Sequence, residues 1–185
     1  MSQKLPQKSS GGRTLVNVLG IPSILLMIYI GGLPFWGFVT IVSILCLREF
    51  YQLGKHQNIH PQFVAGYLVS FLITLYFFFG PAHPLTFVRP SEFLVILTPY
   101  VVLAEIFRAK PNAMSNISMT LSGILYIPFL LGTMVGIREI DPISPDMGMK
   151  LTFCLFMGIW MCDSAAYIIG KQWGERKLIE RVSPK

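Results

Sequence analysis

The chain has 185 residues, of which 53% are apolar and only 13% are charged. Soluble domains carry about 25% charged residues, so this composition excludes a water-soluble domain, and its high hydrophobicity excludes a disordered chain. The three cysteines are odd in number and lie in apolar runs, which excludes a disulfide framework. We therefore predict an all-α, polytopic membrane protein that does not bind nucleic acid, with its net charge of +6 carried by basic loops.

Apolar segments long enough to cross a bilayer, which takes about 20 residues, recur along the chain. We predict six spans: Leu15–Ile30, Leu33–Leu53, Gln62–Gly80, Glu92–Phe107, Met119–Ile137 and Leu151–Gly170. Pro99 and Pro128 predict kinks in the fourth and fifth spans. Two glycine pairs, Gly132 with Gly136 and Gly170 with Gly174, have the spacing of close helix crossings, although such pairs also occur without one.

The basic residues predict the orientation. With six spans and a cytosolic N-terminus, 12 of the 15 basic residues fall on the cytosolic side and 3 on the other, a strong positive-inside asymmetry. The cytosolic group is Lys4, Lys8, Arg13, Arg48, Lys55, Arg108, Lys110, Lys171, Arg176, Lys177, Arg181 and Lys185, and the other group is Arg89, Arg138 and Lys150. Both termini are therefore expected in the cytosol.

Three regions follow from this pattern. Residues 1–14 form a basic tail expected to be disordered, residues 15–170 a transmembrane helical domain, and residues 171–185 a basic cytosolic segment. The sequence shows no transit peptide, which favours the inner membrane of a bacterium over an organelle membrane.

Three acidic residues in or near the predicted spans are informative, because an ionisable group costs about 2.5–3.5 kcal/mol at a helix centre. Glu105 precedes the cation Arg108 by three residues, so a structural ion pair explains it. Glu49 lies beside Arg48 near the end of the second span, which fits either a polar interfacial cluster or a functional role.

Asp163 is the acidic residue with the strongest indication of function. It lies inside the sixth span, and none of its sequence neighbours can neutralise it. Trp160, Asp163, Tyr167 and Gly170 share one helical face. Because this face carries polar and small side chains, we expect it to meet protein or a water-filled cavity. The alternative is that Asp163 is a protonated or hydrogen-bonded structural aspartate.

Basic residues follow Asp163, from Lys171 to Lys185. A carboxylate suits Mg²⁺, which takes oxygen ligands and shares them with phosphates, and the cations suit polyphosphate or a phospholipid headgroup. A positive-inside anchor explains most of the cations, but it does not explain the acid.

The segment Ile159–Lys185 closely resembles the central motif of the phosphatidate cytidylyltransferases, or CDP-diacylglycerol synthases. That pattern runs W-x-x-D-x-x-A-Y-x-x-G-x-x-x-G, a basic linker, then S-P-K-K-T-x-E-G. The matching residues here are Trp160, Asp163, Ala166, Tyr167, Gly170, Gly174, Ser183, Pro184 and Lys185. Weaker matches occur earlier in the chain, at Arg13-Thr14, Glu49-Phe50-Tyr51, Gly123 and Tyr126.

The resemblance implies an Mg²⁺-dependent enzyme in which phosphatidate attacks the α-phosphate of CTP, giving CDP-diacylglycerol and pyrophosphate. By the same resemblance, Asp163 is a catalytic, metal-associated residue, and Ser183, Pro184 and Lys185 form the substrate phosphate loop, with Lys185 also catalytic. Tyr167 and Lys171 are candidate substrate-binding residues beside Asp163. The resemblance also suggests a homodimer surrounded by membrane lipids.

The sequence stops at Lys185, inside the S-P-K-K-T-x-E-G motif. Family members continue to a signature with further acidic residues, so we expect this sequence to be a fragment that is inactive alone. Two other classes remain open: a small transporter or channel subunit with Asp163 as its ion site, and a non-catalytic membrane scaffold.

Overall fold

The computed structural model describes residues 10–55, 57–80, 90–140, 144 and 146–174, and in these residues all regular secondary structure is helical. The helices are α1 (Ser10–Ile30), α2 (Gly32–Lys55), α3 (Phe63–Phe79), α4 (Pro90–Arg108), α5 (Ala113–Tyr126), α6 (Pro128–Arg138) and α7 (Met147–Trp173). The predicted all-α architecture is therefore confirmed.

The predicted spans coincide with these helices to within a few residues, except that the fifth is divided between α5 and α6. Three stretches are long and apolar enough to cross a membrane: Gly32–Gly54, Ala113–Arg138 and Met147–Gln172. Leu19–Ile30 and Phe63–Phe79 are shorter apolar helices. Together with the all-helical architecture, these segments confirm the polytopic membrane class.

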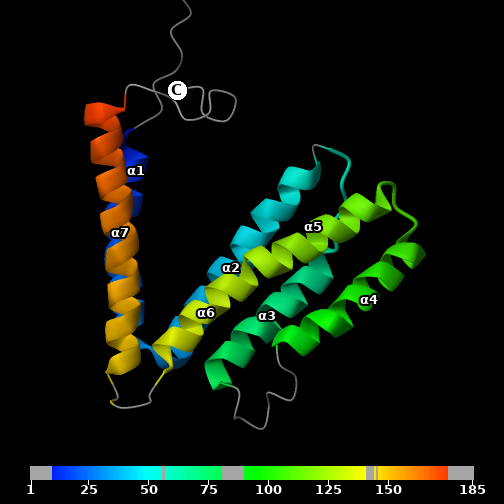
Figure 1. Ribbon diagram of the computed structural model, residues 1–185, viewed down its shortest axis with the longest axis horizontal. Helices are drawn as coiled ribbons and strands as arrows, with labels where there is room; N and C mark the ends of the chain where they lie inside the picture. The colour runs from blue at the N-terminus through cyan, green and yellow to red at the C-terminus, as the bar shows by residue number, and fades with distance from the viewer. Residues whose placement is uncertain (1–9, 56, 81–89, 141–143, 145, 175–185) are drawn as a thin grey trace, which may run out of the picture.

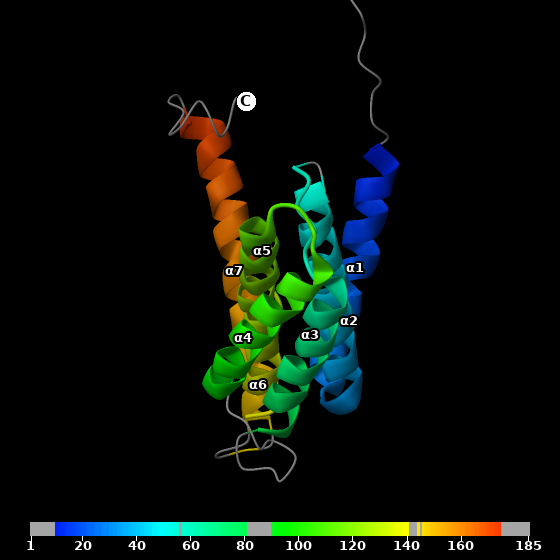
Figure 2. The ribbon, with the colours of Figure 1, turned by 90° about the vertical axis from the view of Figure 1, so that its right-hand side faces the viewer.

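Helices α2 to α6 form a bundle, and α1 and α7 stand at one side of it (Figure 1). Helix α3 packs against α6 and α2 over long stretches, and α4 packs mainly against α5. Helix α7 contacts only α6 and α1 extensively. The second view shows α1 and α7 spreading apart toward the ends that carry the chain termini (Figure 2).

Two apolar clusters hold the helices together. One joins α3, α4 and α5 through the buried side chains Val69, Ile73, Leu97, Val101 and Ile124. The other joins α1, α2 and α6 through Ile28, Phe35, Val39 and Val135. Hydroxyl pairs add polar contacts between α2 and α3, where Thr40 meets Thr74 and Ser43 meets Ser70, each at 2.9 Å between oxygens.

The glycine pair in α6 marks a real helix crossing. A Cβ atom on Gly132 would lie 2.6 Å from Cδ2 of Phe77, and one on Gly136 would lie 3.0 Å from Cδ1 of the same ring. The two glycines therefore let the Phe77 side chain of α3 lie directly on the α6 backbone. The second predicted pair is not a crossing in the described residues, because a Cβ atom on Gly170 would have no neighbour from another helix within 4 Å.

Pro128 interrupts the fifth predicted span. Helix α5 ends at Tyr126, Ile127 forms the break, and Pro128 is the first residue of α6. Proline cannot donate a backbone hydrogen bond and its ring clashes with the preceding turn. Pro99 has a milder effect, since α4 continues through it from Pro90 to Arg108.

The α1–α2 turn is held by side chains from the end of α6. Gly31 and Gly32 adopt left-handed φ angles of 66° and 57°, which glycine tolerates best. Arg138 Nε donates to the Ile28 carbonyl at 2.7 Å, and Glu139 Oε1 accepts from the Gly32 amide at 3.0 Å. A cation thus caps the C-terminal end of α1 while an anion caps the N-terminal end of α2.

Candidate functional site

Asp163 lies on α7, ten residues before the helix ends at Trp173, or about 15 Å along the axis. Helix α7 is anchored by its first half, where Gly148 and Thr152 are buried. Residues 161–170, including Asp163, are exposed throughout. The described residues therefore do not form the protein wall or cavity that the sequence predicted around this carboxylate, because α7 diverges from the bundle before it reaches Asp163.

Tyr167 and Lys171 continue the same polar face one and two turns after Asp163. The Lys171 ammonium lies 5.9 Å from the centre of the Tyr167 ring, within the range of a cation–π contact. This contact holds a cation at the end of α7 that is predicted to face the cytosol. The structure therefore places an acid, an aromatic ring and a cation in order along α7.

Ser183, Pro184 and Lys185 lie outside the described residues, so the predicted phosphate loop stays a prediction. Among the residues that are described, no group of three or more histidine, cysteine, aspartate or glutamate side chains is placed to hold a metal ion. Asp163 offers one carboxylate. Mg²⁺ is commonly held by one or two carboxylates together with phosphate oxygens and water, so Asp163 fits as part of such a ligand set.

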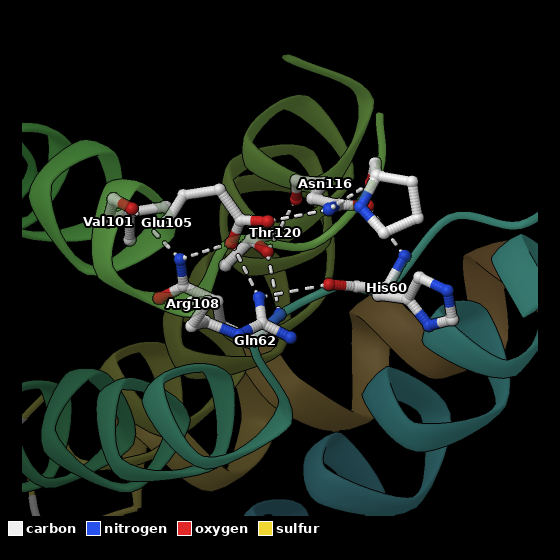
Figure 3. A network of polar contacts seen from close by, with 8 residues as sticks. His60, Gln62, Val101, Glu105, Arg108, Asn116 and Thr120 are labelled. Carbon is white, nitrogen blue, oxygen red and sulfur yellow. Dashed lines mark hydrogen bonds and ion pairs between the residues drawn. The ribbon is translucent and has the colours of Figure 1, made fainter. Parts of the chain in front are cut away.

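A second polar centre lies inside the bundle, at the end predicted to face the cytosol (Figure 3). Its centre is Glu105 on α4, only 2% exposed. The carboxylate accepts hydrogen bonds from Asn116 Nδ2 at 2.6 Å, Gln62 Nε2 at 3.0 Å and Arg108 Nη1 at 2.5 Å. These donors come from three parts of the chain, so Glu105 ties α4 to α5 and to the segment that precedes α3.

The same residues fix the backbone between α2 and α3. The His60 amide donates to Asn116 Oδ1 at 2.6 Å, and the His60 carbonyl accepts from Arg108 Nη1 at 3.0 Å. The backbone amide of Gln62 donates to the Thr120 hydroxyl at 2.9 Å. Every one of these groups is hydrogen-bonded, as buried polar groups usually are, and we call Glu105 with Gln62, Arg108, Asn116 and Thr120 the Glu105 network.

Tyr51 extends this polar centre into α2. Its hydroxyl donates to the Thr120 carbonyl at 2.9 Å, and the ring is fully buried. Two glycines make room for it, because a Cβ on Gly66 would lie 2.6 Å from the Tyr51 oxygen and one on Gly123 would lie 2.5 Å from Cε1. Glu49, two residues earlier, is exposed on the other side of α2, where it lines an apolar groove with Tyr126 and Leu130.

Sequence reasoning found only part of the Glu105 network. The Glu105–Arg108 ion pair is the structural contact that their spacing predicted. Gln62, Asn116 and Thr120 were missed as members, because they come from different elements, and so was the contact that Tyr51 makes with Thr120. One signal was present: Gln62 and Asn116 are amide side chains at the borders of apolar runs, where an unpaired amide is costly.

Known proteins resemble the chain over almost its full length. A family model described as "Cytidylyltransferase family" matches residues 11–185. The chain belongs to the cytidylyltransferase family. Its match includes α7 with Asp163 and reaches the predicted phosphate loop, so the resemblance carried by Ile159–Lys185 is confirmed at the level of the family.

Three curated relatives are named phosphatidate cytidylyltransferase. The Bacillus subtilis protein is 26% identical over 175 residues, covering 93% of this chain and 62% of the relative. The Synechocystis protein is 26% identical over 195 residues, covering 94% and 64%. The Haemophilus influenzae protein is 38% identical over 58 residues, covering 31% and 20%. This cytidylyltransferase-family chain thus spans less than two thirds of the first two relatives, and no solved structure matches it.

Proposed function

We propose that this chain is part of a CTP:phosphatidate cytidylyltransferase, which transfers CMP from CTP to phosphatidate and releases pyrophosphate. The observation that carries the proposal is the family match over residues 11–185, together with relatives named phosphatidate cytidylyltransferase. The apolar helices support it, because phosphatidate is a lipid and the enzyme must meet it at the bilayer. The proposed location is the inner membrane of a bacterium.

The proposed reaction needs no protein nucleophile, since the phosphate of phosphatidate attacks CTP itself. Catalysis then consists of positioning the two phosphates and neutralising their charge. In this proposal Lys171 faces substrate phosphate from the end of α7, with Tyr167 beside it. Ser183, Pro184 and Lys185 supply the phosphate loop, and Lys185 neutralises charge that develops on the transferred group.

Mg²⁺ is the proposed cofactor, and it would supply charge neutralisation of the triphosphate. Asp163 contributes one oxygen ligand to it in this proposal. The exposure of Asp163 supports a role that involves an external group, because no described residue satisfies its carboxylate. An ionised carboxylate surrounded only by lipid tails would carry a high free-energy cost.

The test uses the protein expressed from its complete gene and purified in detergent with phosphatidate. Conversion of radiolabelled CTP to CDP-diacylglycerol should require both phosphatidate and Mg²⁺. We expect Asp163→Asn to reduce kcat at least about 100-fold, as removal of a charge-stabilising group does, while the melting temperature stays unchanged. Cys162→Ser, at the exposed neighbouring position, is the matched control and should keep full activity.

Measuring ion flux as well as CTP turnover with the same Asp163→Asn variant separates the enzyme from the transporter alternative. An ion site at Asp163 predicts that Asp163→Asn changes ion flux into proteoliposomes and leaves CTP turnover unaffected. The family match favours the enzyme. Absence of CTP turnover in the wild-type protein would overturn the proposal. A homodimer is proposed as the assembly, and light scattering of the purified protein tests it.

A further inference from the structure

A second cavity lies at the opposite end of the bundle from the Glu105 network, between the ends of α3 and α6. Its volume is about 570 Å³, within the range of small-molecule sites. Its described lining includes Tyr76, Phe77, Phe78, Phe79, Phe129 and Glu139. The proposed transferase reaction uses none of these residues.

The described lining of this cavity carries one charge. Among the residues that the structure describes there, Glu139 is the only charged one. The carboxylate is half-buried, and one of its oxygens, Oε1, accepts from the Gly32 amide at 3.0 Å. Within the part of the chain described here, Oε2 has no hydrogen-bond partner. A cationic or hydrogen-bond-donating ligand would satisfy that oxygen, whereas an anion would be repelled.

Five of the lining residues are aromatic, and their rings pack against one another. Ring centres lie 5.7 Å apart for Tyr76–Phe77 and 5.9 Å for Phe77–Phe129, both near edge-to-face. Aromatic faces carry negative potential and attract organic ammonium groups, the more so where water is excluded. A cavity lined by both a carboxylate and clustered aromatic rings suits an alkylammonium ion, whereas a purely apolar ligand would leave Glu139 Oε2 without a partner.

The position of the cavity indicates where such an ammonium would come from. Helices α3 and α6 both end here, at the side that the basic residues place away from the cytosol, and phospholipid headgroups meet helix ends at this level. We propose that this cavity binds the ammonium headgroup of a zwitterionic phospholipid, with Glu139 as the counter-ion and Phe77 and Phe129 as aromatic contacts. The site is distinct from the transferase site on α7.

Native mass spectrometry of the detergent-purified protein tests this site. The protein is offered phosphatidylethanolamine, phosphatidylcholine and phosphatidylglycerol with identical acyl chains, singly and in equimolar mixture. We expect the two ammonium-bearing lipids to be retained about fivefold over phosphatidylglycerol, the scale of one desolvated cation–π and carboxylate contact. Equal retention of all three lipids would overturn the proposal.

Two variants and a control assign the preference to this cavity. Glu139→Gln keeps an oxygen that can accept from the Gly32 amide but removes the charge, and it should abolish the preference. Phe129→Leu removes one ring and should weaken the preference. This variant provides an independent test if Glu139→Gln fails to fold. Glu49→Gln removes an equivalent charge from the groove on α2 and should change nothing. A preference that survives Phe129→Leu unchanged, or that is lost in Glu49→Gln, contradicts the assignment.

Discussion

Asn116 Nδ2 donates to Glu105 Oε1 across 2.6 Å, while Oδ1 of the same amide accepts from the His60 amide, also at 2.6 Å. One side chain on α5 thus contacts both α4 and the segment between α2 and α3. A side-chain amide carries its donor and its acceptor on separate atoms, so Asn116 can make both hydrogen bonds at once. The packing of three segments at this end of the bundle therefore depends on one amide and one carboxylate.

Replacing Glu105 with alanine should destabilise the protein strongly. The change leaves the Asn116 and Gln62 amides and the Arg108 guanidinium without their shared acceptor. Each buried donor that loses its acceptor costs about 1–3 kcal/mol of the free energy of unfolding, and loss of the Arg108 ion pair adds less because that side chain is 31% exposed. Unfolding by sodium dodecyl sulfate in mixed micelles measures this loss.

Glu49→Ala is the matched control for that change. Glu49 is an exposed glutamate on α2, outside the Glu105 network, so its removal should change stability by less than about 0.5 kcal/mol. Similar losses in the two variants would show that the Glu105 network does not hold the three segments together.

A methyl group added at Gly132 should also destabilise the bundle. The new Cβ would lie 2.6 Å from the Phe77 ring, so α3 and α6 must separate or the ring must turn. Overpacking of this kind costs about 1–3 kcal/mol, and we expect Gly132→Ala to lower the melting temperature accordingly. Gly158→Ala is the control, because a Cβ atom added there would meet no neighbouring side chain or helix within 4 Å among the described residues, and alanine favours a helix. This variant should melt at or above the wild-type temperature.

Arg138→Met should loosen the turn between α1 and α2. The substitution removes the donors to the Ile28 and Tyr29 carbonyls and leaves the end of α1 uncapped. Each lost charged hydrogen bond contributes about 1.5–3 kcal/mol. Faster hydrogen exchange at Gly31 and Gly32 would report the loosening. Lys150→Met, at an exposed position on α7, should leave that exchange unchanged.

Tyr51→Phe isolates one hydrogen bond of the polar centre. It removes the donor to the Thr120 carbonyl and keeps the ring between Gly66 and Gly123. We expect a loss of about 1 kcal/mol in the free energy of unfolding, read from chemical denaturation. Tyr29→Phe removes a hydroxyl from a residue that is 68% exposed and should have no measurable effect. A Tyr51→Phe protein as stable as wild type would contradict this role.

The helices were predictable because long apolar runs cannot leave their backbone groups unpaired in a bilayer. The boundary at Ile30 was predicted to the residue, and α3 was predicted to within one residue at each end. The division at Pro128 was predicted only as a kink, because the sequence does not say whether the next turn re-forms at once. The crossing at Gly132 required knowing that Phe77, more than 50 residues earlier, would lie on it.

The candidate site was predictable only where its residues are neighbours in sequence. Asp163, Tyr167 and Lys171 follow helical spacing, and the structure places them on α7 as expected. Their surroundings were not predictable, since those depend on which elements pack against the second half of α7. The Glu105 network was largely missed for a related reason: its partners are separated by up to 58 residues, and amides carry no charge pattern that links them.

The hydrogen bonds between Arg138 and the α1–α2 turn have a consequence for biosynthesis. The donor and its acceptor at Ile28 are 110 residues apart, so the first hairpin leaves the ribosome long before the side chains that fasten it have been translated. Membrane insertion of α1 and α2 must therefore begin before the Arg138 side chain can form hydrogen bonds to the turn. The hydrogen bonds from Arg138 to the α1–α2 turn can form only after the end of α6 has been synthesised.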